Sequence, residues 1–539
     1  MLGALFVGLV FAQGWINEDA FILFRTVDNF HQGLGLRWNA FERVQSYSCP
    51  SWTLLLTAFD TFVRNPFLSA ILLSLVCAAG TYAACVAWCR GTARWRLPFL
   101  MGLLISSKSF IDYSSSGLEN PLAHLLLVAV AVAYLRHVAG PPADGLRSAY
   151  ALLAAAALLV LTRQDMALMA APFVLHVLVR LLRAIGPKRV AIACLACGIP
   201  IWLWEAFSLL YYGFLVPNTA YAKLGHGGAR AVMNREAWQY LMATIQADPI
   251  TVAIVACGIL TAILDGDLPS GLLVAGVVAY LLYLVDIGGD WMLGRFVAAP
   301  VLASSLVLAR RLGPRAAALA AGVLLIANVR APLAPIKFWT PYPAETVHLW
   351  GVIDAKAAKY GPKEARRLLW RARPYEEDPV FQAGVAFRNS ADAVVVRGDV
   401  GRFGYGAGPD KIVVDSMGLT DPLLARLPAD RIRRSGHYQR DVPPGYLESL
   451  VTGENRIRDA GLAAYYGHLK SVTQGPLFSP ERLRDVLAFN LGRYDHLKAD
   501  YVERHRDQVR RLDTWWLIHG GLPPHASPSP SAPTPPDPH

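Results

Sequence analysis

The chain has 539 residues, of which 54% are hydrophobic and only 17% are charged, and its mean hydropathy is +0.34. This composition excludes an ordinary soluble globular protein and indicates an integral membrane protein. The formal net charge of +11 does not indicate nucleic-acid binding, because the arginines mostly flank apolar blocks, where basic residues orient a membrane protein.

Apolar blocks of roughly 15 to 23 residues follow one another as far as Arg330, which is the length of a membrane-crossing helix or slightly less. The first block, Met1 to Ile16, is short and lacks the charged start of a signal peptide. We therefore expect it to be a membrane span. The pattern predicts eleven crossing segments, at 1–16, 67–88, 97–111, 119–138, 148–162, 165–183, 189–211, 249–264, 268–286, 291–309 and 315–330.

Residues 17–50 are polar and aromatic, and we expect them to form a loop. The loop begins with Glu18 and Asp19, two adjacent carboxylates at the point where the first apolar segment ends. Acids beside a bilayer are costly, so we interpret this pair as functional. The next apolar stretch, 51–63, is too short to cross and is predicted to be an interfacial or re-entrant helix.

The distribution of basic residues predicts which side of the membrane each loop faces. If the N-terminus is cytoplasmic, one side receives short basic turns, as the positive-inside rule requires. The basic residues of the other side are interleaved with acids, amides and aromatic residues. An odd number of crossings then places the 17–50 loop and residues 331–539 together outside the cytoplasm.

The chain changes composition after Pro332. We expect a transmembrane catalytic domain at 1–330, a soluble extracytoplasmic α/β domain at 331–522 and a disordered Pro/Ser-rich tail at 523–539. The α/β content rests on predicted strands at 393–396 and 412–414 and predicted helices near 354–371 and 480–490.

A glycine-rich stretch, 401–408, lies between the two predicted strands. It lacks the lysine and serine of a phosphate-binding loop, so we expect a turn-rich connection. No ligand spacing in the chain requires a metal, although its carboxylates permit a divalent cation.

Polar residues of both signs recur in five loops on the predicted outer side. Loops at one face of a helical bundle can converge on one cavity, so we expect a single pocket at the membrane surface. There a carboxylate can take a proton from a hydroxyl, and arginines can hold a phosphate. For Arg163 with Asp165, or Asp290 with Arg295, a local ion pair is the alternative. Besides Glu18 and Asp19, the candidates are Arg25, Arg43, Glu119, Arg163, Asp165, Asn218, Tyr221, Lys223, Asp290 and Arg295.

The stretch Asn17-Glu18-Asp19-Ala20-Phe21-Ile22, followed by residues 33–39 and 42–48, resembles the first external loop of GT-C membrane glycosyltransferases. More narrowly, it is similar to the branch that contains mycobacterial terminal β-arabinofuranosyltransferases and related bacterial proteins, some of them called flagellar motor control proteins. Further similar stretches lie in order at 116–122, 162–165, 211–223, 288–296, 404–405 and 414–422.

This resemblance implies a sugar donor attached to polyprenyl phosphate and a reaction at the outer face of the bacterial cytoplasmic membrane. It also implies that Asp19 is the general base on the acceptor hydroxyl, with Glu18 supporting it or sharing the role. The candidates for the lipid phosphate are Arg163, Lys223 and Arg295, and those for sugar hydroxyls are Asn218 and Tyr221.

The predicted function is therefore transfer of a sugar such as arabinofuranose from polyprenyl phosphate to an envelope glycan or a surface protein. One alternative is a transporter or flippase of envelope precursors, which would more often show internal repeats and charges in mid-helix. Another is a non-catalytic membrane scaffold for surface machinery, which only a degenerate first loop would favour.

Overall fold

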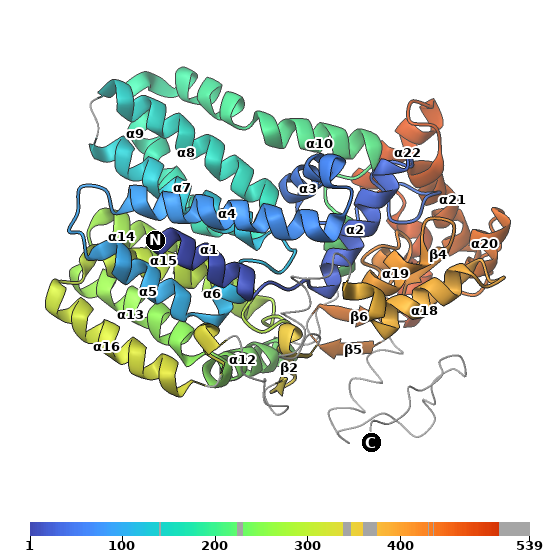
Figure 1. Cartoon of the computed structure of the whole chain (residues 1–539). Helices are drawn as coiled ribbons and strands as arrows, with labels where there is room; N and C mark the ends of the chain where they lie inside the picture. Colours follow the sequence, from blue (N-terminus) through green and yellow to red (C-terminus); the bar gives the residue numbers. More distant parts are fainter. Residues whose placement is uncertain are drawn as a thin grey trace.

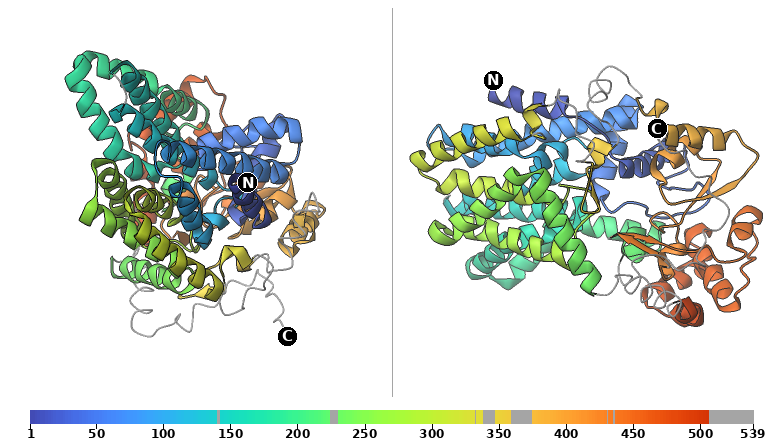
Figure 2. Two further views of the ribbon diagram at one scale, coloured as in Figure 1. Left: turned by 60° about the vertical axis from the view of Figure 1, so that its left-hand side comes forward. Right: turned by 90° about the horizontal axis from the view of Figure 1, so that it is seen from below.

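The computed structural model describes residues 1–139, 142–223, 230–331, 333–337, 347–358, 374–429, 431–434 and 436–505. Figure 1 shows two parts, a bundle of helices up to residue 330 and a smaller part of mixed helices and strands at one end of it. The two further views in Figure 2 show the same arrangement.

The first part is helical throughout. Its helices are α1 (Leu2–Ala12), α2 (Glu18–His31), α3 (Pro50–Val63), α4 (Pro66–Trp88), α5 (Arg96–Ser106), α6 (Lys108–Asp112), α7 (Asn120–Ala139), α8 (Pro142–Thr162), α9 (Ala167–Cys197), α10 (Ile199–Tyr211), α11 (Asn218–Lys223), α12 (Arg230–Ala247), α13 (Pro249–Asp265), α14 (Leu268–Asp286), α15 (Ala298–Arg311) and α16 (Pro314–Arg330).

Several of these helices are long and apolar enough to cross a membrane. Within the described ranges six qualify, in α4, α7, α8, α9, α14 and α16, or seven if α12 and α13, bent by 108°, form one broken span. The chain is therefore a multi-pass membrane protein, and the count of eleven crossings stays a prediction. The predicted spans that do not qualify include the shorter helices α1, α5, α10 and α15.

The expectation of a loop over 17–50 is wrong for its first half, because residues 18–31 form α2. Asn17 caps this helix, since its side chain accepts a hydrogen bond from the Asp19 N–H at 2.9 Å. The two acids of the first turn also stabilise the helix through its dipole. The candidate base therefore sits on a helix terminus.

The second part combines short strands with helices. Its elements are η2 (Pro335–Lys337), β1 (His348–Leu349), β2 (Val352–Ile353), η4 (Pro374–Glu377), α18 (Pro379–Arg388), β3 (Val394–Arg397), α19 (Gly401–Ala407), β4 (Ile412–Asp415), η5 (Leu424–Arg426), β5 (Arg431–Arg434), β6 (His437–Gln439), α20 (Tyr446–Thr452), α21 (Ala460–Gln474), α22 (Pro480–Asn490) and η6 (Asp495–Lys498).

The strands β3 and β4 pair in parallel, with Val394 opposite Ile412, while β1–β2 and β5–β6 are antiparallel pairs. The predicted strands at 393–396 and 412–414 and the predicted helix at 480–490 are thus confirmed. Most of the helix predicted near 354–371, and all of the tail at 523–539, lie outside the described residues. The separate α/β domain stays a prediction.

The glycine-rich stretch 401–408 is a helix, α19, and the expectation of a turn-rich connection is wrong. Its glycines allow a close approach to other segments. A Cβ added to Gly401 would lie 2.2 Å from the carbonyl oxygen of Glu18, and one on Gly404 would lie 2.4 Å from the ring of Trp38. The missing side chains therefore let α19 pack directly against α2 and the loop that follows it.

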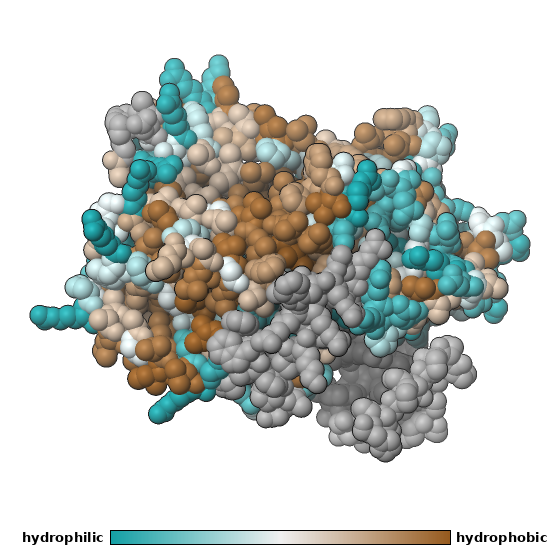
Figure 3. Space-filling view, viewed as in Figure 1, coloured by the Kyte–Doolittle hydropathy of each residue, from teal (hydrophilic) through white to brown (hydrophobic). Residues whose placement is uncertain are grey.

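Aromatic residues complete the contact between the two parts. The ring of Phe21 on α2 lies 5.4 Å from that of Tyr375 and 5.7 Å from that of Tyr405. These residues belong to one buried cluster that also includes side chains of α3 and α4. Figure 3 shows apolar surface concentrated over the helical part and polar surface over much of the second part. Through these aromatic contacts α2 packs against both the helical part and the second part of the chain.

Candidate active site

The start of α2 is fixed against two loops of the helical part. The Asn17 N–H donates to the carbonyl oxygen of Ser116 at 2.8 Å, and its side-chain amide lies 3.1 Å from Sδ of Met292. The adjacent Asp19 keeps 35% of its side chain exposed. This carboxylate is therefore positioned by a rigid helix end and still open to a ligand.

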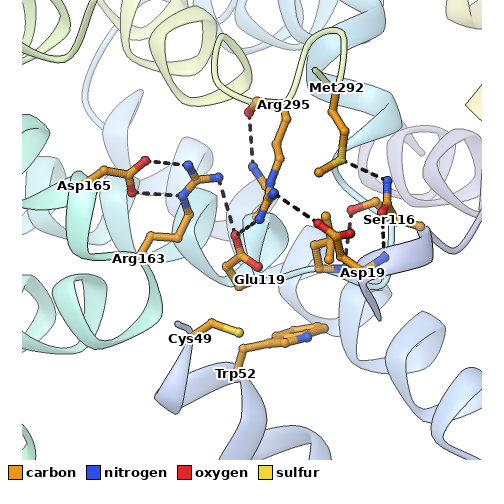
Figure 4. A network of polar contacts seen from close by, with 12 residues as sticks. Asp19, Cys49, Trp52, Ser116, Glu119, Arg163, Asp165, Met292 and Arg295 are labelled. Atoms are coloured by element: carbon orange, nitrogen blue, oxygen red, sulfur yellow. Dashed lines mark hydrogen bonds and ion pairs between the residues drawn. The ribbon is translucent and has the colours of Figure 1, made fainter. Parts of the chain in front are cut away.

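Asp19 lies at one end of a chain of ionic contacts (Figure 4). The Arg295 guanidinium is 3.8 Å from Asp19 Oδ2 and 3.0 Å from Glu119 Oε1. The same Glu119 oxygen is 3.5 Å from the guanidinium of Arg163. Glu119 is buried, so one carboxylate orients both arginines in a setting where ionic hydrogen bonds are strong.

Arg163 is held from its other side by Asp165, with contacts of 3.1 and 2.5 Å. The Tyr280 hydroxyl donates to Asp165 at 2.9 Å, and the guanidinium lies 4.9 Å from the ring centroid of Phe296. The local ion pair considered from the sequence therefore exists. It also extends through Glu119 to Arg295, so it forms part of the larger network.

The loop that carries Arg295 is held by backbone contacts. The Leu293 N–H donates to the Ile353 carbonyl at 3.0 Å, and the Ile353 N–H donates to the Trp291 carbonyl at 2.9 Å. Gly294 has a φ of +85°, and a Cβ there would lie 2.8 Å from Ser109 Oγ. Only glycine fits this position without a shift, so the backbone beside Arg295 is closely defined.

The same two cations act on two carboxylates of the site. Burial raises the pKa of Asp19, while Arg295 and Lys223 oppose that rise. Burial likewise raises the pKa of Asp290, with the same two cations opposing it. Asp290 accepts a hydrogen bond from the Trp291 N–H at 2.8 Å through one oxygen, whereas its other oxygen is buried with no hydrogen-bond partner among the described residues. A raised pKa makes a carboxylate a stronger base.

Glu18 has different partners from Asp19, although the two are neighbours. One of its oxygens accepts a hydrogen bond from the Arg402 N–H at 2.8 Å, and the other lies 3.3 Å from the Arg402 guanidinium. Arg402 belongs to α19 and also pairs with Asp378. Glu18 therefore connects α2 to the second part of the chain.

Arg25 and Arg43 are buried, and their contacts differ from those of the ionic network around Arg295. Their guanidinium groups donate to backbone carbonyls and connect distant segments. The acceptors are Trp38, Gly404 and Lys411 for Arg25, at 2.8 to 2.9 Å, and Tyr211 and Val472 for Arg43, at 3.1 and 3.4 Å.

Asn218 and Tyr221 hold α11 against the second part. The Asn218 amide donates to three backbone carbonyls at 2.8 to 3.2 Å and accepts from Arg426 at 3.0 Å. The Arg426 guanidinium lies 3.9 Å from the ring centroid of Tyr221. These contacts fix the helix that carries Lys223, whose charge acts on Asp19.

Sequence reasoning missed a second buried ionic group. Lys108 lies 2.9 Å from Asp354, and Lys356 lies 2.7 Å from Asp112. This group holds the segment that contains Ile353, and thereby the loop of Arg295. The spacing of Lys108 and Asp112 was a visible signal, since residues four apart meet on a helix. The contacts to residues 354 and 356 are long-range and gave no such signal.

Figure 4 adds Cys49 and Trp52, two residues of the α3 region that were not predicted as site residues. They lie on the side of Glu119 opposite Arg295. The Trp52 indole donates to the Gly117 carbonyl at 3.1 Å. Within the part of the chain that the structure describes, no group of three or more His, Cys, Asp or Glu side chains is placed to hold a metal ion.

Comparison with known proteins agrees with the resemblance. The chain is 28% identical over 333 residues to a terminal β-(1→2)-arabinofuranosyltransferase of Corynebacterium glutamicum, covering 54% of this chain and 47% of that protein. It is 31% identical over 224 residues to the terminal β-(1→2)-arabinofuranosyltransferase of Mycobacterium tuberculosis, covering 39% of this chain and 35% of that protein. The chain is a distant homologue of these proteins. It spans less than half the length of either relative.

No family model matches the chain. Among solved structures, ArnT from Cupriavidus metallidurans in the apo state aligns with a TM-score of 0.47 and 16% identity, covering 79% of this chain and 76% of that chain. The same protein bound to undecaprenyl phosphate aligns with a TM-score of 0.47 and 15% identity, covering 78% and 75%.

Proposed function

We propose that this protein is a GT-C glycosyltransferase that transfers arabinofuranose from a polyprenyl-phosphate donor to an envelope glycan or a surface protein. The observation that carries the proposal is the partly exposed Asp19 carboxylate, with its raised pKa, 3.8 Å from Arg295. The distant homology to terminal β-(1→2)-arabinofuranosyltransferases supports the choice of sugar.

In the proposed reaction, a hydroxyl of the acceptor attacks the anomeric carbon of the donor sugar. Asp19 takes the hydroxyl proton, and a general base of this kind contributes about 10²- to 10⁴-fold to a rate. The bond between the anomeric carbon and the phosphate oxygen breaks, and polyprenyl phosphate leaves with the electron pair. A cation close to this oxygen stabilises the charge that develops there.

Arg295 and Lys223 supply that positive charge in our proposal. Both lower the pKa of Asp19, so their positive charge reaches the position of the proposed base. Arg163 is already neutralised by Asp165 and Glu119. Its proposed role is to hold Glu119, and through it Arg295, in place before the donor binds.

We also propose that the site faces outward from the bacterial cytoplasmic membrane. The contacts of Glu18 with Arg402, and of Arg25 with Gly404, support placing the first polar segment and the second part of the chain on one side. The short turns at the opposite ends of the helices are basic, and basic turns favour the cytoplasmic side of a membrane.

The base assignment is tested by Asp19→Asn. Membranes containing the variant are given polyprenyl-phosphate arabinose and an arabinan acceptor, and transfer of radiolabelled sugar is measured. We expect a loss of about 10²- to 10⁴-fold, because the amide cannot take a proton. Asp19→Glu is the matched control and should retain part of the activity. Undiminished transfer by Asp19→Asn, at equal protein level, contradicts the assignment.

The substrates are tested separately in a deletion strain. Extracted lipids should contain accumulated polyprenyl-phosphate arabinose, and envelope glycans or surface proteins should lack terminal arabinose. Accumulation of a different polyprenyl-phosphate sugar would contradict the choice of arabinofuranose while leaving the proposed class of reaction in place.

A further inference from the structure

Helix α22 presents an apolar stripe on the surface of the second part of the chain. Leu483, Leu487 and Leu491 recur every fourth residue, so they lie on one side of the helix, and they expose 43%, 57% and 57% of their surface. Phe478, just before the helix, exposes 72%. Exposed apolar residues that gather in this way mark a surface that meets an apolar partner.

The neighbouring face of α22 is attached to the segment that directly follows α10. Arg482 donates to the carbonyl of Tyr211 at 3.1 Å, and Asn490 donates to the carbonyl of Gly213 at 2.8 Å. Leu483 directly follows Arg482, and Leu491 directly follows Asn490. Successive residues of a helix point about 100° apart, so the leucines lie on the side of the helix next to the attached face. The stripe therefore lies beside the end of α10.

The surface of α10 and of the segment after it is itself apolar. Helix α10 follows α9, which is long and apolar enough to span the membrane, and α10 is itself one of the shorter apolar helices. Figure 1 shows α22 next to the end of α10. The exposed apolar residues of α10 and the segment after it are Ile199, Trp202, Leu203, Leu209, Leu210, Leu215 and Val216.

From this continuity we propose that α22 lies in the surface of the lipid bilayer, with Leu483, Leu487 and Leu491 among the acyl chains just below the headgroups. The exposed Arg484 lies on the same side of the helix, and the exposed Arg493 follows shortly after it. Arginine side chains at this depth reach to lipid phosphates while their stems cover apolar surface. The helix thereby fixes the second part of the chain against the membrane.

The test uses the full chain in phosphatidylglycerol-containing vesicles. In a background with the exposed Cys194 and Cys257 replaced by serine, Leu487→Cys is labelled with the fluorophore NBD. The matched control is Val451→Cys on α20, which is also exposed, at 53%, and which Figure 1 places away from α10. The unsubstituted background measures residual labelling.

We expect the emission of the label at residue 487 to be shifted to the blue and to be quenched by phosphatidylcholine carrying a 5-doxyl group. The label at residue 451 should show neither effect and should be quenched by iodide in the water. The proposal is overturned if doxyl lipid quenches the two labels equally. It is also overturned if residue 487 is protected from both quenchers, since protein would then cover it. Neither result depends on glycosyl transfer.

Discussion

Glu18 and Asp19, neighbouring acids of the first turn of α2, have different partners because successive helical residues point about 100° apart. Glu18 meets Arg402 of α19, whereas Asp19 meets Arg295 of the helical part. The sequence identified the pair but not this division, because the partner of Glu18 lies 384 residues away. The carboxylate of Asp19 belongs to the ionic network drawn in Figure 4.

The opposing effects on the pKa of Asp19 predict a pH dependence. A general base acts when deprotonated, so if Asp19 is the base we expect transfer to fall as the pH drops through a pKa that burial has raised above the usual value of about 3.9. Lys223 lowers this pKa, so Lys223→Met should move the acid limb of kcat/KM to higher pH. Lys188→Met, an exposed change on α9, should not move it. An acid limb at lower pH in Lys223→Met contradicts the prediction.

Arg295 contacts both Asp19 and Glu119, which predicts a specific defect when it is removed. Arg295→Ala should raise the KM for the polyprenyl-phosphate donor more than the KM for the acceptor. Arg295→Lys keeps the charge but cannot reproduce the two contacts of a planar guanidinium, so it should recover activity only in part. Equal changes in both KM values would indicate a purely structural role for Arg295.

The sequence predicted in part which candidate site residues meet in the structure. Asp19, Glu119, Arg163, Asp165 and Arg295 meet in one ionic network, and Asp290 and Lys223 act on it electrostatically. Arg25, Arg43 and Asn218 instead bind backbone carbonyls. Their residue types did not indicate this, because the N–H groups of a guanidinium or an amide can donate to a backbone carbonyl as well as to a carboxylate.

Among the elements, the strands β3 and β4 were recognisable from their apolar runs, but α2 and α19 were not recognised as helices. Helix α2 carries polar residues such as Arg25 and Asn29 on a face that is buried by a distant segment, so its pattern is not that of a surface helix. Helix α19 is rich in glycine, which disfavours helices. Tertiary packing decides both elements.

The close packing of α19 predicts a sensitive position. Gly404→Ala places a Cβ 2.4 Å from Trp38 and should destabilise the protein by about 1 to 3 kcal/mol, the usual cost of overpacking. Gly467→Ala on α21 is the matched control, because its Cβ would meet an atom only at 3.9 Å. Thermal unfolding in detergent measures both. Equal unfolding temperatures would show that α19 can move away from Trp38.

At the level of the whole molecule, α2 and the second part of the chain belong to one end of the helical bundle, as Figures 1 and 2 show. The sequence predicted a common side from the parity of its crossings, although the structure identifies only six or seven helices by length and composition in the described ranges. Direct contacts, such as those of Arg25 with Gly404 and Lys411, instead show that α2 and the second part lie at the same end of the bundle.

The orientation of the molecule is tested by a reporter fused after Arg330. Alkaline phosphatase, which needs an oxidising environment, should be active there, and a cytoplasmic reporter such as β-galactosidase should not. The same reporters fused after Arg90, in a short basic turn, should give the opposite result. Activity of the cytoplasmic reporter after Arg330 contradicts the proposed outward orientation.

The contacts of Arg25 also bear on the order in which the protein is made. Its carbonyl partners Gly404 and Lys411 lie 379 and 386 residues further along the chain. During synthesis α2 is made well before these partners, so its buried guanidinium has no complete set of acceptors until residues 404 and 411 have been translated. Such distant pairings are slow to form. The helix that carries Asp19 therefore cannot complete its packing before α19 and the segment after it have been made.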